Sequence, residues 1–183
     1  YKLMGLAPYG KPIYKDLIYN NLITVYQDGT FKLNQKFFDY STGLTMINSN
    51  FENLFGRKVK KIDEKIDQFY MDVAASIQLV LEEIILKICK HIKAEYKISN
   101  LCLAGGVALN CSLNGRIKKE KIFKNIFIQP ASGDAGISYG SCLVSTLKRK
   151  KLKAKRINNF FTGTRESERI IKKNLIKRKI KFK

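Results

Sequence analysis

Two glycine-containing loops carry the residues of this chain that could do chemistry. The first lies in LAGGVALN at 103–110, where Gly105 and Gly106 directly follow a short apolar run. Glycines there let the backbone approach a ligand closely, and the N–H groups at the start of a following helix attract phosphate. Asn110, one helical turn past Gly106, offers a donor and an acceptor near that helix end. The same pattern also fits a plain tight turn with Asn110 facing water.

The second loop, QPASGDAG at 129–136, holds a carboxylate. Asp134 stands just before an expected helix, where its side chain could cap the first turn. The functional alternative is a ligand for a metal ion over the phosphates of a nucleotide, with Gly133 and Gly136 keeping the approach clear. Because parallel-sheet folds bind ligands outside the carboxyl ends of their strands, both loops are expected on one side of one sheet.

The elements around these loops alternate between strand and helix. The apolar runs 100–104 and 125–129 are predicted strands, and the segments 107–120 and 137–149 are predicted helices. Residues 99–147 should therefore form two strand–loop–helix units of an α/β layer structure.

Upstream, apolar residues at steps of three and four predict a long helix over 63–96, with Asp63 and Glu64 at its positive end. Polar residues such as Gln78 and Glu82 interrupt its apolar character, so it is not a membrane-spanning segment. Asp28-Gly29 between two β-prone runs predicts a hairpin with a tight two-residue turn. Residues 1–12 are expected to be rich in turns, and residues 37–56 to be packed loop and short turns.

Other kinds of active site find little support in the chain. It has no P-loop motif, and its only histidine, His91, is expected at the boundary of the long helix. A Ser-His-Asp or Cys-His site is therefore not favoured. The four cysteines show no C-x-x-C spacing, so we interpret them as reduced packing residues of a cytoplasmic protein.

The net charge of +20 is unevenly distributed along the chain. Residues 1–147 carry a net +6, whereas residues 148–183 hold 16 Lys and Arg against two acidic residues, a net +14. Lysine outnumbers arginine 28 to 7, although arginine forks interleaved with aromatics are more typical of phosphate-reading surfaces. We expect a solvated basic linker and no nucleic-acid partner. A nucleic-acid-binding module is the alternative, and its binding would weaken steeply with salt.

Four segments in order resemble the O-carbamoyltransferases of the nodulation and antibiotic-tailoring type. They are KLMGLAPYGKP (2–12), DVAASIQLVLEE (72–83), NLCLAGGVALNCSLNGRI (100–117) and IFIQPASGDAGISYGSCL (126–143). The resemblance covers residues 1–147. It implies part of an actin-like ATPase or sugar-kinase (ribonuclease H-like) α/β fold, and a chain that is a piece of a longer protein.

The resemblance also implies a division of the chain and a reaction. Residues 1–147 would be part of the carbamoyl-transfer domain, 148–159 a basic linker, and 160–183 the start of a truncated α+β domain that forms carbamoyl-adenylate. That domain would make carbamoyl-adenylate from carbamoyl phosphate and ATP. The actin-like domain, with a bound divalent metal that is often iron, would then pass the carbamoyl group to a hydroxyl of a small-molecule acceptor.

By motif matching, Asp134 would be a metal ligand and Gly105, Gly106 and Asn110 would line the nucleotide site, with Gly133 and Gly10 alongside. The histidine ligands of the family lie upstream of the opening motif, so the piece is expected to be inactive alone. Within the same fold, a tRNA threonylcarbamoyl transferase and a sugar kinase are the alternatives.

Overall fold

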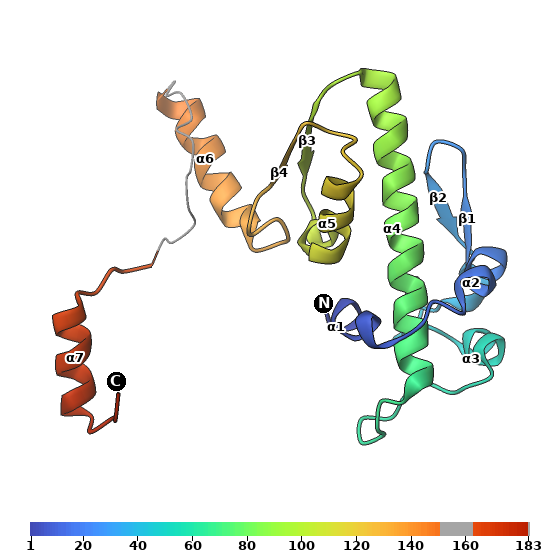
Figure 1. Ribbon diagram of the computed structural model, residues 1–183, viewed down its shortest axis with the longest axis horizontal. Helices are drawn as coiled ribbons and strands as arrows, with labels where there is room; N and C mark the ends of the chain where they lie inside the picture. Colours follow the sequence, from blue (N-terminus) through green and yellow to red (C-terminus); the bar gives the residue numbers. More distant parts are fainter. Residues whose placement is uncertain (151–162, 183) are drawn as a thin grey trace. The chain divides into compact units, whose positions relative to one another are not determined.

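The computed structural model describes residues 1–150 and 163–182, which fall into an N-terminal unit, Tyr1–Ser138, and a C-terminal unit, Tyr139–Lys183 (Figure 1). The elements of the N-terminal unit are α1 (Lys2–Leu6), η1 (Ala7–Tyr9), α2 (Lys15–Asn21), β1 (Ile23–Val25), β2 (Phe31–Leu33), η2 (Gln35–Phe37), α3 (Ser49–Phe55), α4 (Gln68–Tyr96), β3 (Asn100–Leu103), η3 (Gly106–Leu109), α5 (Cys111–Lys119) and β4 (Asn125–Ile128). Helix α6 (Gly136–Lys150) begins there and continues into the C-terminal unit, which also holds α7 (Glu168–Lys177).

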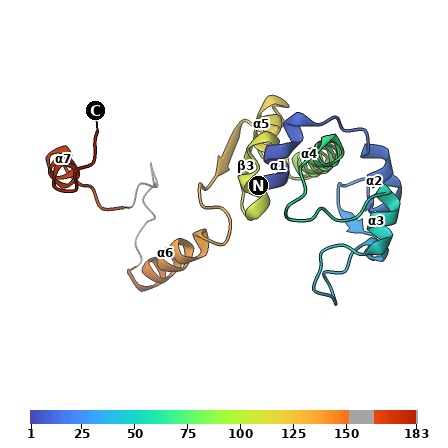
Figure 2. The same ribbon diagram turned by 90° about the horizontal axis from the view of Figure 1, so that it is seen from below.

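Helix α4 is the centre of the N-terminal unit. Helices α2 and α3 and the hairpin lie on one side of it, and β3, β4 and α5 lie on the other (Figures 1 and 2). Each side has its own apolar cluster. Ile18, Leu22 and Phe37 pack against Val80 and Ile84 of α4. The second cluster joins α4 to α5 and the strands, and its buried members are Leu86, Cys89, Leu113, Ile117 and Phe123. Two covered sides explain why α4 is apolar around much of its circumference.

The predicted helix over 63–96 is confirmed for its body but not for its start. Asp67 is the N-cap, because its carboxylate accepts a hydrogen bond from the Phe69 N–H at 3.1 Å. Glu64 therefore lies in the preceding loop, where it forms an ion pair with Arg57 at 3.3 Å. Acidic residues do precede the helix, as predicted, but the one that caps it is Asp67, directly before the first turn, and not Asp63 or Glu64.

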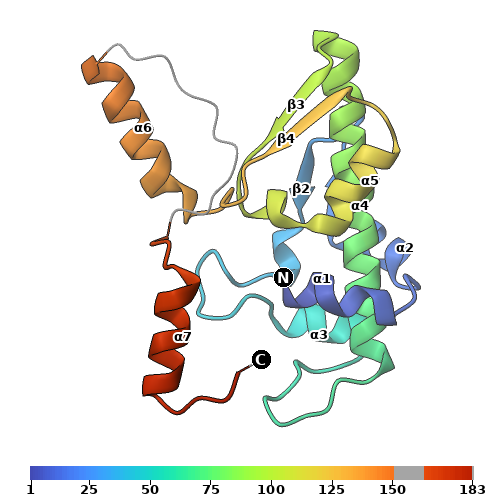
Figure 3. The same ribbon diagram turned by 60° about the vertical axis from the view of Figure 1, so that its left-hand side comes forward.

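Strands β3 and β4 pair in parallel, with Asn100 opposite Asn125 and Leu103 opposite Ile128 (Figure 3). The prediction of two strand–loop–helix units with both loops on one side of one sheet is confirmed, because parallel strands bring their carboxyl ends to the same edge. The first predicted helix, 107–120, is not continuous. Residues 106–109 form the short η3, and α5 begins only after Asn110, whose backbone is extended.

The opening segment, expected to be rich in turns, instead folds as α1 and η1 against α4. The Lys11 N–H donates to the Asp72 carboxylate at 2.7 Å, and the Tyr14 N–H donates to the Ser76 hydroxyl at 3.0 Å. Gly10 lies so close to α4 that a Cβ on it would overlap backbone atoms of Met71 and Asp72. The motif around Gly10 is thus fixed by the surface of a helix about sixty residues downstream.

The hairpin forms as predicted, with β1 and β2 antiparallel and Ile23 opposite Leu33. Its turn is not the predicted two-residue type, because only Gly29 has a positive φ, of 90°. The Asp28 carboxylate instead accepts hydrogen bonds from the backbone and the hydroxyl of Thr30, which stabilises a longer loop. Residues 37–56 were expected to be packed loop and short turns, but they include the seven-residue helix α3, which Asn48 caps.

Parts of the remaining predictions are corrected. Helix α6 extends through Lys150, so the first three residues of the predicted linker, 148–150, are helical. Residues 151–159 of that linker lie outside the described residues. All four cysteines are free; Cys89 is buried, as a packing role requires, whereas the other three are exposed within the described residues. None of the helices that the structure describes is long and apolar enough to cross a membrane.

Replacing Gly10 by alanine should destabilise the N-terminal unit. Overpacking against a helix backbone costs about 1–3 kcal/mol, measurable by urea unfolding followed by circular dichroism. Gly5→Ala is the matched control, because a Cβ at Gly5 meets no atom within 4 Å. Since alanine favours helix, that control should be neutral or stabilising by up to about 1 kcal/mol. Equal stability of the two variants would contradict the close packing of Gly10.

Candidate functional site

A cleft of about 380 Å³ lies where three distant segments of the N-terminal unit meet. Helix α1 contributes Met4, α4 contributes Leu81, and the first glycine loop contributes Gly106 and Asn110. The full lining is Tyr1, Met4, Leu81, Gly106, Val107, Leu109 and Asn110. Its walls are mostly apolar, and Asn110 and Tyr1 are the lining residues with polar side-chain groups. This composition is typical of small-molecule sites.

Two larger hollows, of about 550 and 490 Å³, lie along the hairpin. They share Tyr19, Ile23 and Thr24 and contain none of the predicted site residues. Glu83 lines the larger one, and it is already paired with Lys15 at 2.8 Å. We therefore place the candidate site at the smaller cleft, where the glycine loop is.

The first loop has a backbone conformation at Gly105 that requires glycine. Gly105 adopts φ 95° and ψ 167°, a conformation that residues with a Cβ rarely adopt. No atom lies within 4 Å of the position that a Cβ would take on Gly106. The backbone at Gly106 is thus open on that side, beside the cleft.

The second loop touches the first. The Gly105 N–H donates to the Ser132 carbonyl at 2.8 Å, and a Cβ on Gly133 would lie 3.7 Å from the Gly106 Cα. Three buried side-chain atoms around the loops have no hydrogen-bond partner among the described residues: Asn114 Oδ1, Gln129 Oε1 and Ser132 Oγ. Buried polar atoms normally have partners, so they mark a region that is incomplete without a ligand or further protein.

Asn110 lines the cleft, but most of its amide group is used within the fold. Its Oδ1 accepts from the Leu113 N–H at 3.0 Å, which caps α5, and from Gln78 Nε2 at 3.2 Å. Its Nδ2 donates to Gln78 Oε1 at 2.9 Å. One Nδ2 hydrogen remains for a ligand. The prediction that Asn110 lies near a helix N-terminus is correct. The helix begins directly after Asn110, however, about one turn later than the predicted start at residue 107.

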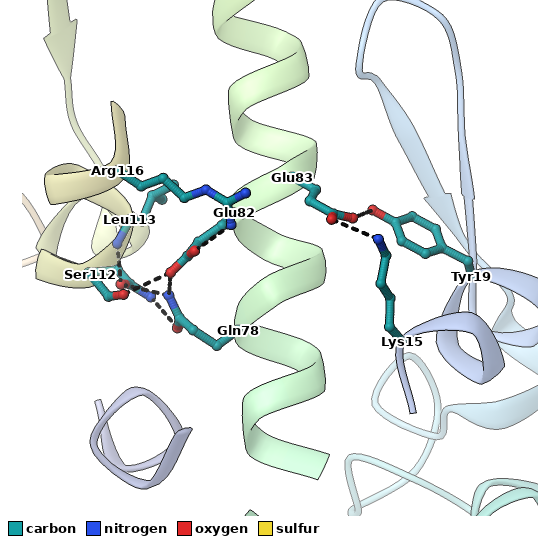
Figure 4. A network of polar contacts seen from close by, with 9 residues as sticks. Lys15, Tyr19, Gln78, Glu82, Glu83, Ser112, Leu113 and Arg116 are labelled. Carbon is teal, nitrogen blue, oxygen red and sulfur yellow. Dashed lines mark hydrogen bonds and ion pairs between the residues drawn. The ribbon is translucent and has the colours of Figure 1, made fainter. Parts of the chain in front are cut away.

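Glu82 anchors the same network from α4 (Figure 4). It is 8% exposed and accepts hydrogen bonds from Gln78 Nε2 at 2.7 Å, Ser112 Oγ at 2.8 Å and Arg116 Nη1 at 2.8 Å. Burial by itself would raise the pKa of Glu82, but hydrogen bonds from Gln78, Arg116 and Ser112 outweigh it and lower the pKa. Sequence reasoning missed this network. The available signal was a pair of polar residues four apart, Gln78 and Glu82, within an apolar helix.

The predicted site residues separate into three groups. Gly105, Gly106, Asn110 and Gly133 lie together at the loops. Asp134 follows Gly133 and is exposed, and no hydrogen bond to its carboxylate occurs within the described residues. Those residues also include no group of three or more His, Cys, Asp or Glu that could hold a metal. Gly10 does not line the cleft, and its contact with α4 already accounts for the missing side chain.

Glu82→Gln should make the free energy of unfolding fall less steeply as the pH is lowered. A lowered folded-state pKa gives stability that is present above the ordinary value of 4.5 and lost as the pH falls through the folded pKa. The variant should be less stable at neutral pH by about 1–2 kcal/mol, because it loses a charge-assisted pair. Urea unfolding at steps between about pH 7 and pH 3 measures both effects. Parallel stability profiles of the parent and the variant would contradict this role.

Comparison with known proteins shows which family this chain resembles. Residues 1–143 match the family described as Carbamoyltransferase N-terminus. An uncharacterized protein of Synechocystis sp. is 54% identical over 143 residues, which are 78% of this chain and 23% of that protein. The nodulation protein NolNO of Sinorhizobium fredii is 35% identical over 79% of this chain and 20% of its own length, and NolO of Bradyrhizobium diazoefficiens is 34% identical over 79% and 24%.

The chain spans about a quarter or less of the length of these relatives. The matched stretch contains the cleft, both glycine loops and the network on α4. The resemblance found in the four motifs is confirmed, and the chain belongs to the carbamoyltransferase N-terminus family.

Proposed function

We propose that this chain is part of an O-carbamoyltransferase that moves a carbamoyl group from carbamoyl-adenylate to a hydroxyl of a small-molecule acceptor. The carrying observation is the contact between the two loops at the carboxyl ends of β3 and β4, beside a cleft in the stretch that matches the family. In this proposal the cleft beside Gly106 receives part of the nucleotide.

The local geometry supports a nucleotide there. Gly106 leaves the backbone open to a ligand, and the unpartnered Ser132 hydroxyl and Gln129 carbonyl lie in the facing loop. The nine-residue helix α5 begins at Asn110, so the partial positive charge at its N-terminus is directed at the same region. The Ser132 hydroxyl and the N–H groups at that helix end would stabilise phosphate oxygens, whereas the side-chain carbonyl of Gln129 would accept a hydrogen bond from a ribose hydroxyl.

The proposed reaction does not require a nucleophilic side chain. The carbonyl of an acyl-adenylate is already activated by its anhydride bond to phosphate, and adenylate leaves as a stable anion. The protein has to hold that carbonyl next to an acceptor hydroxyl and stabilise the developing oxyanion. Backbone N–H groups and a helix N-terminus can supply part of that stabilisation.

The larger fold that we propose is actin-like. Strands β3 and β4 turn Leu101, Leu103 and Ile126 toward α5 and α4, whereas Cys102 and Phe127 on the other face are exposed. Parallel sheets are normally wider than two strands and covered on both faces. We infer that strands and helices from the rest of the full-length protein complete this sheet.

A metal ion fits this site only in part. Asp134 is exposed at the second loop, and its carboxylate is a suitable oxygen ligand. Because the described residues hold no group of three potential ligands, Asp134 would be one ligand among others supplied by the rest of the protein. A bound metal would act as a Lewis acid that polarises the carbamoyl carbonyl.

The full-length protein should release pyrophosphate from ATP and orthophosphate from carbamoyl phosphate when it is given both, because carbamoyl-adenylate formation breaks the bond between the α- and β-phosphates of ATP and removes the phosphate of carbamoyl phosphate. Pyrophosphate and ADP are measured in the same reaction. A sugar kinase of the same fold would release ADP instead. Formation of ADP without pyrophosphate would contradict the proposal.

Asp134→Ala in the full-length protein should lower the amount of bound metal and the rate of carbamoyl transfer. Stability should change by less than about 0.5 kcal/mol, because the exposed carboxylate makes no hydrogen bond within the described residues. Metal analysis of the purified variant measures the first effect and thermal unfolding the second. If Asp134 is only a helix cap, stability falls by about 0.5–2 kcal/mol and metal content stays unchanged.

A further inference from the structure

Gln78 on α4 joins the core of the N-terminal unit to the candidate nucleotide cleft. It is 6% exposed, and its amide group exchanges two hydrogen bonds with the amide of Asn110, at 2.9 and 3.2 Å. Asn110 lines the cleft, but Gln78 does not. Gln78 can therefore affect a bound ligand only through Asn110.

Glu82 sets the orientation of the Gln78 amide, whereas the Asn110 amide is oriented jointly by the Leu113 N–H and by Gln78. A carboxylate accepts hydrogen bonds and donates none, so the group of Gln78 that lies 2.7 Å from Glu82 Oε1 must be Nε2. The second hydrogen of Nε2 then reaches Asn110 Oδ1, and Gln78 Oε1 accepts from Asn110 Nδ2. Arg116 and Ser112 hold the Glu82 carboxylate in place at 2.8 Å each.

The Asn110 amide cannot turn over in this arrangement. A reversed amide would place its NH₂ group against the N–H of Leu113 and against the NH₂ group of Gln78, and would lose three hydrogen bonds at once. Asn110 therefore keeps one N–H donor for a ligand, because its Oδ1 already accepts two hydrogen bonds within the fold.

We propose that Gln78 and Glu82 are positioning residues that make Asn110 present a single N–H donor to an acceptor oxygen of the bound nucleotide. This proposal rests on the proposed nucleotide site and adds that two buried residues of α4 determine how Asn110 meets the nucleotide. A ribose hydroxyl or a phosphate oxygen would satisfy that donor. A ligand group that only donates hydrogen bonds would be rejected, because a buried donor would face another donor.

The test is a double-mutant cycle on ATP binding to the full-length protein, measured by titration calorimetry. Gln78→Met keeps the length of the side chain but removes both hydrogen bonds to the Asn110 amide, which is then held by the Leu113 N–H alone. Asn110→Asp keeps the α5 cap but removes the donor. Each single change should weaken ATP binding by about tenfold, the usual effect of one well-oriented hydrogen bond. The double variant should bind no more weakly than Asn110→Asp alone, because Gln78 acts through Asn110.

Glu82→Gln is a second route to the same result, since it lets the Gln78 amide face either way while keeping the shape of the side chain. It should weaken ATP binding while Asn110 is present and have no further effect in a protein that already carries Asn110→Asp. Glu83→Gln is the matched control. Glu83 is the next residue on α4 but points to the opposite side, where it binds Lys15 and Tyr19 (Figure 4). Its loss should leave ATP affinity within about twofold of the parent.

Ser112→Ala separates positioning from simple support of α5. It removes one hydrogen bond to Glu82 without changing which group of Gln78 faces the carboxylate. Stability should fall, and ATP affinity should stay within about twofold of the parent. If Ser112→Ala weakens ATP binding as much as Gln78→Met does, the network only supports the helix and the positioning role is overturned.

The remaining outcomes tell the two proposals apart. If Asn110→Asp weakens ATP binding but Gln78→Met does not, or if their effects add fully, the positioning role fails and the nucleotide site stands. If the parent protein binds no ATP, or if Asn110→Asp has no effect on ATP affinity, the nucleotide site itself is wrong and the positioning role falls with it.

Discussion

Helix α4 carries four polar residues that are each at most 8% exposed, and the rest of the N-terminal unit is arranged to give their side chains partners. They are Asp72, Ser76, Gln78 and Glu82. A buried polar group without a hydrogen bond costs several times more free energy than a satisfied one contributes, so each partner has to be present. Asp72 and Ser76 bind the backbone of residues 11–14, and Gln78 and Glu82 bind side chains of 110–116. One helix thereby fixes the positions of two distant motifs.

This constraint explains how a cleft forms from three segments. The opening segment is held against α4 close to Gly10, and the start of α5 is held one to three turns farther along the same helix. Apolar packing alone allows some sliding between helices, whereas hydrogen bonds to defined atoms specify one register. Met4, Leu81 and Gly106 then line a common space as a consequence.

The parallel pairing of β3 with β4 provides the second half of the site. It brings Gly105 and Ser132 within hydrogen-bonding distance although the two lie far apart in sequence. The exposed Cys102 and Phe127 on the outer face are what we expect of a sheet that is part of a larger one. Family membership and the coverage of about a quarter or less of the relatives are in agreement with that interpretation.

The sequence by itself determined the local elements whose signals are local. Periodic apolar residues gave the body of α4, alternating apolar and glycine-rich segments gave the two strand–loop–helix units, and Gly105 marked a turn that needs a positive φ. Tertiary structure decided which polar groups meet. The close contact of Gly10 with Met71 and the reciprocal pairing of Asn110 with Gln78 depend on atoms 32 to about sixty residues away. No periodicity encodes such a partner, because the free energy of a buried hydrogen bond is gained only when the whole fold brings both groups together.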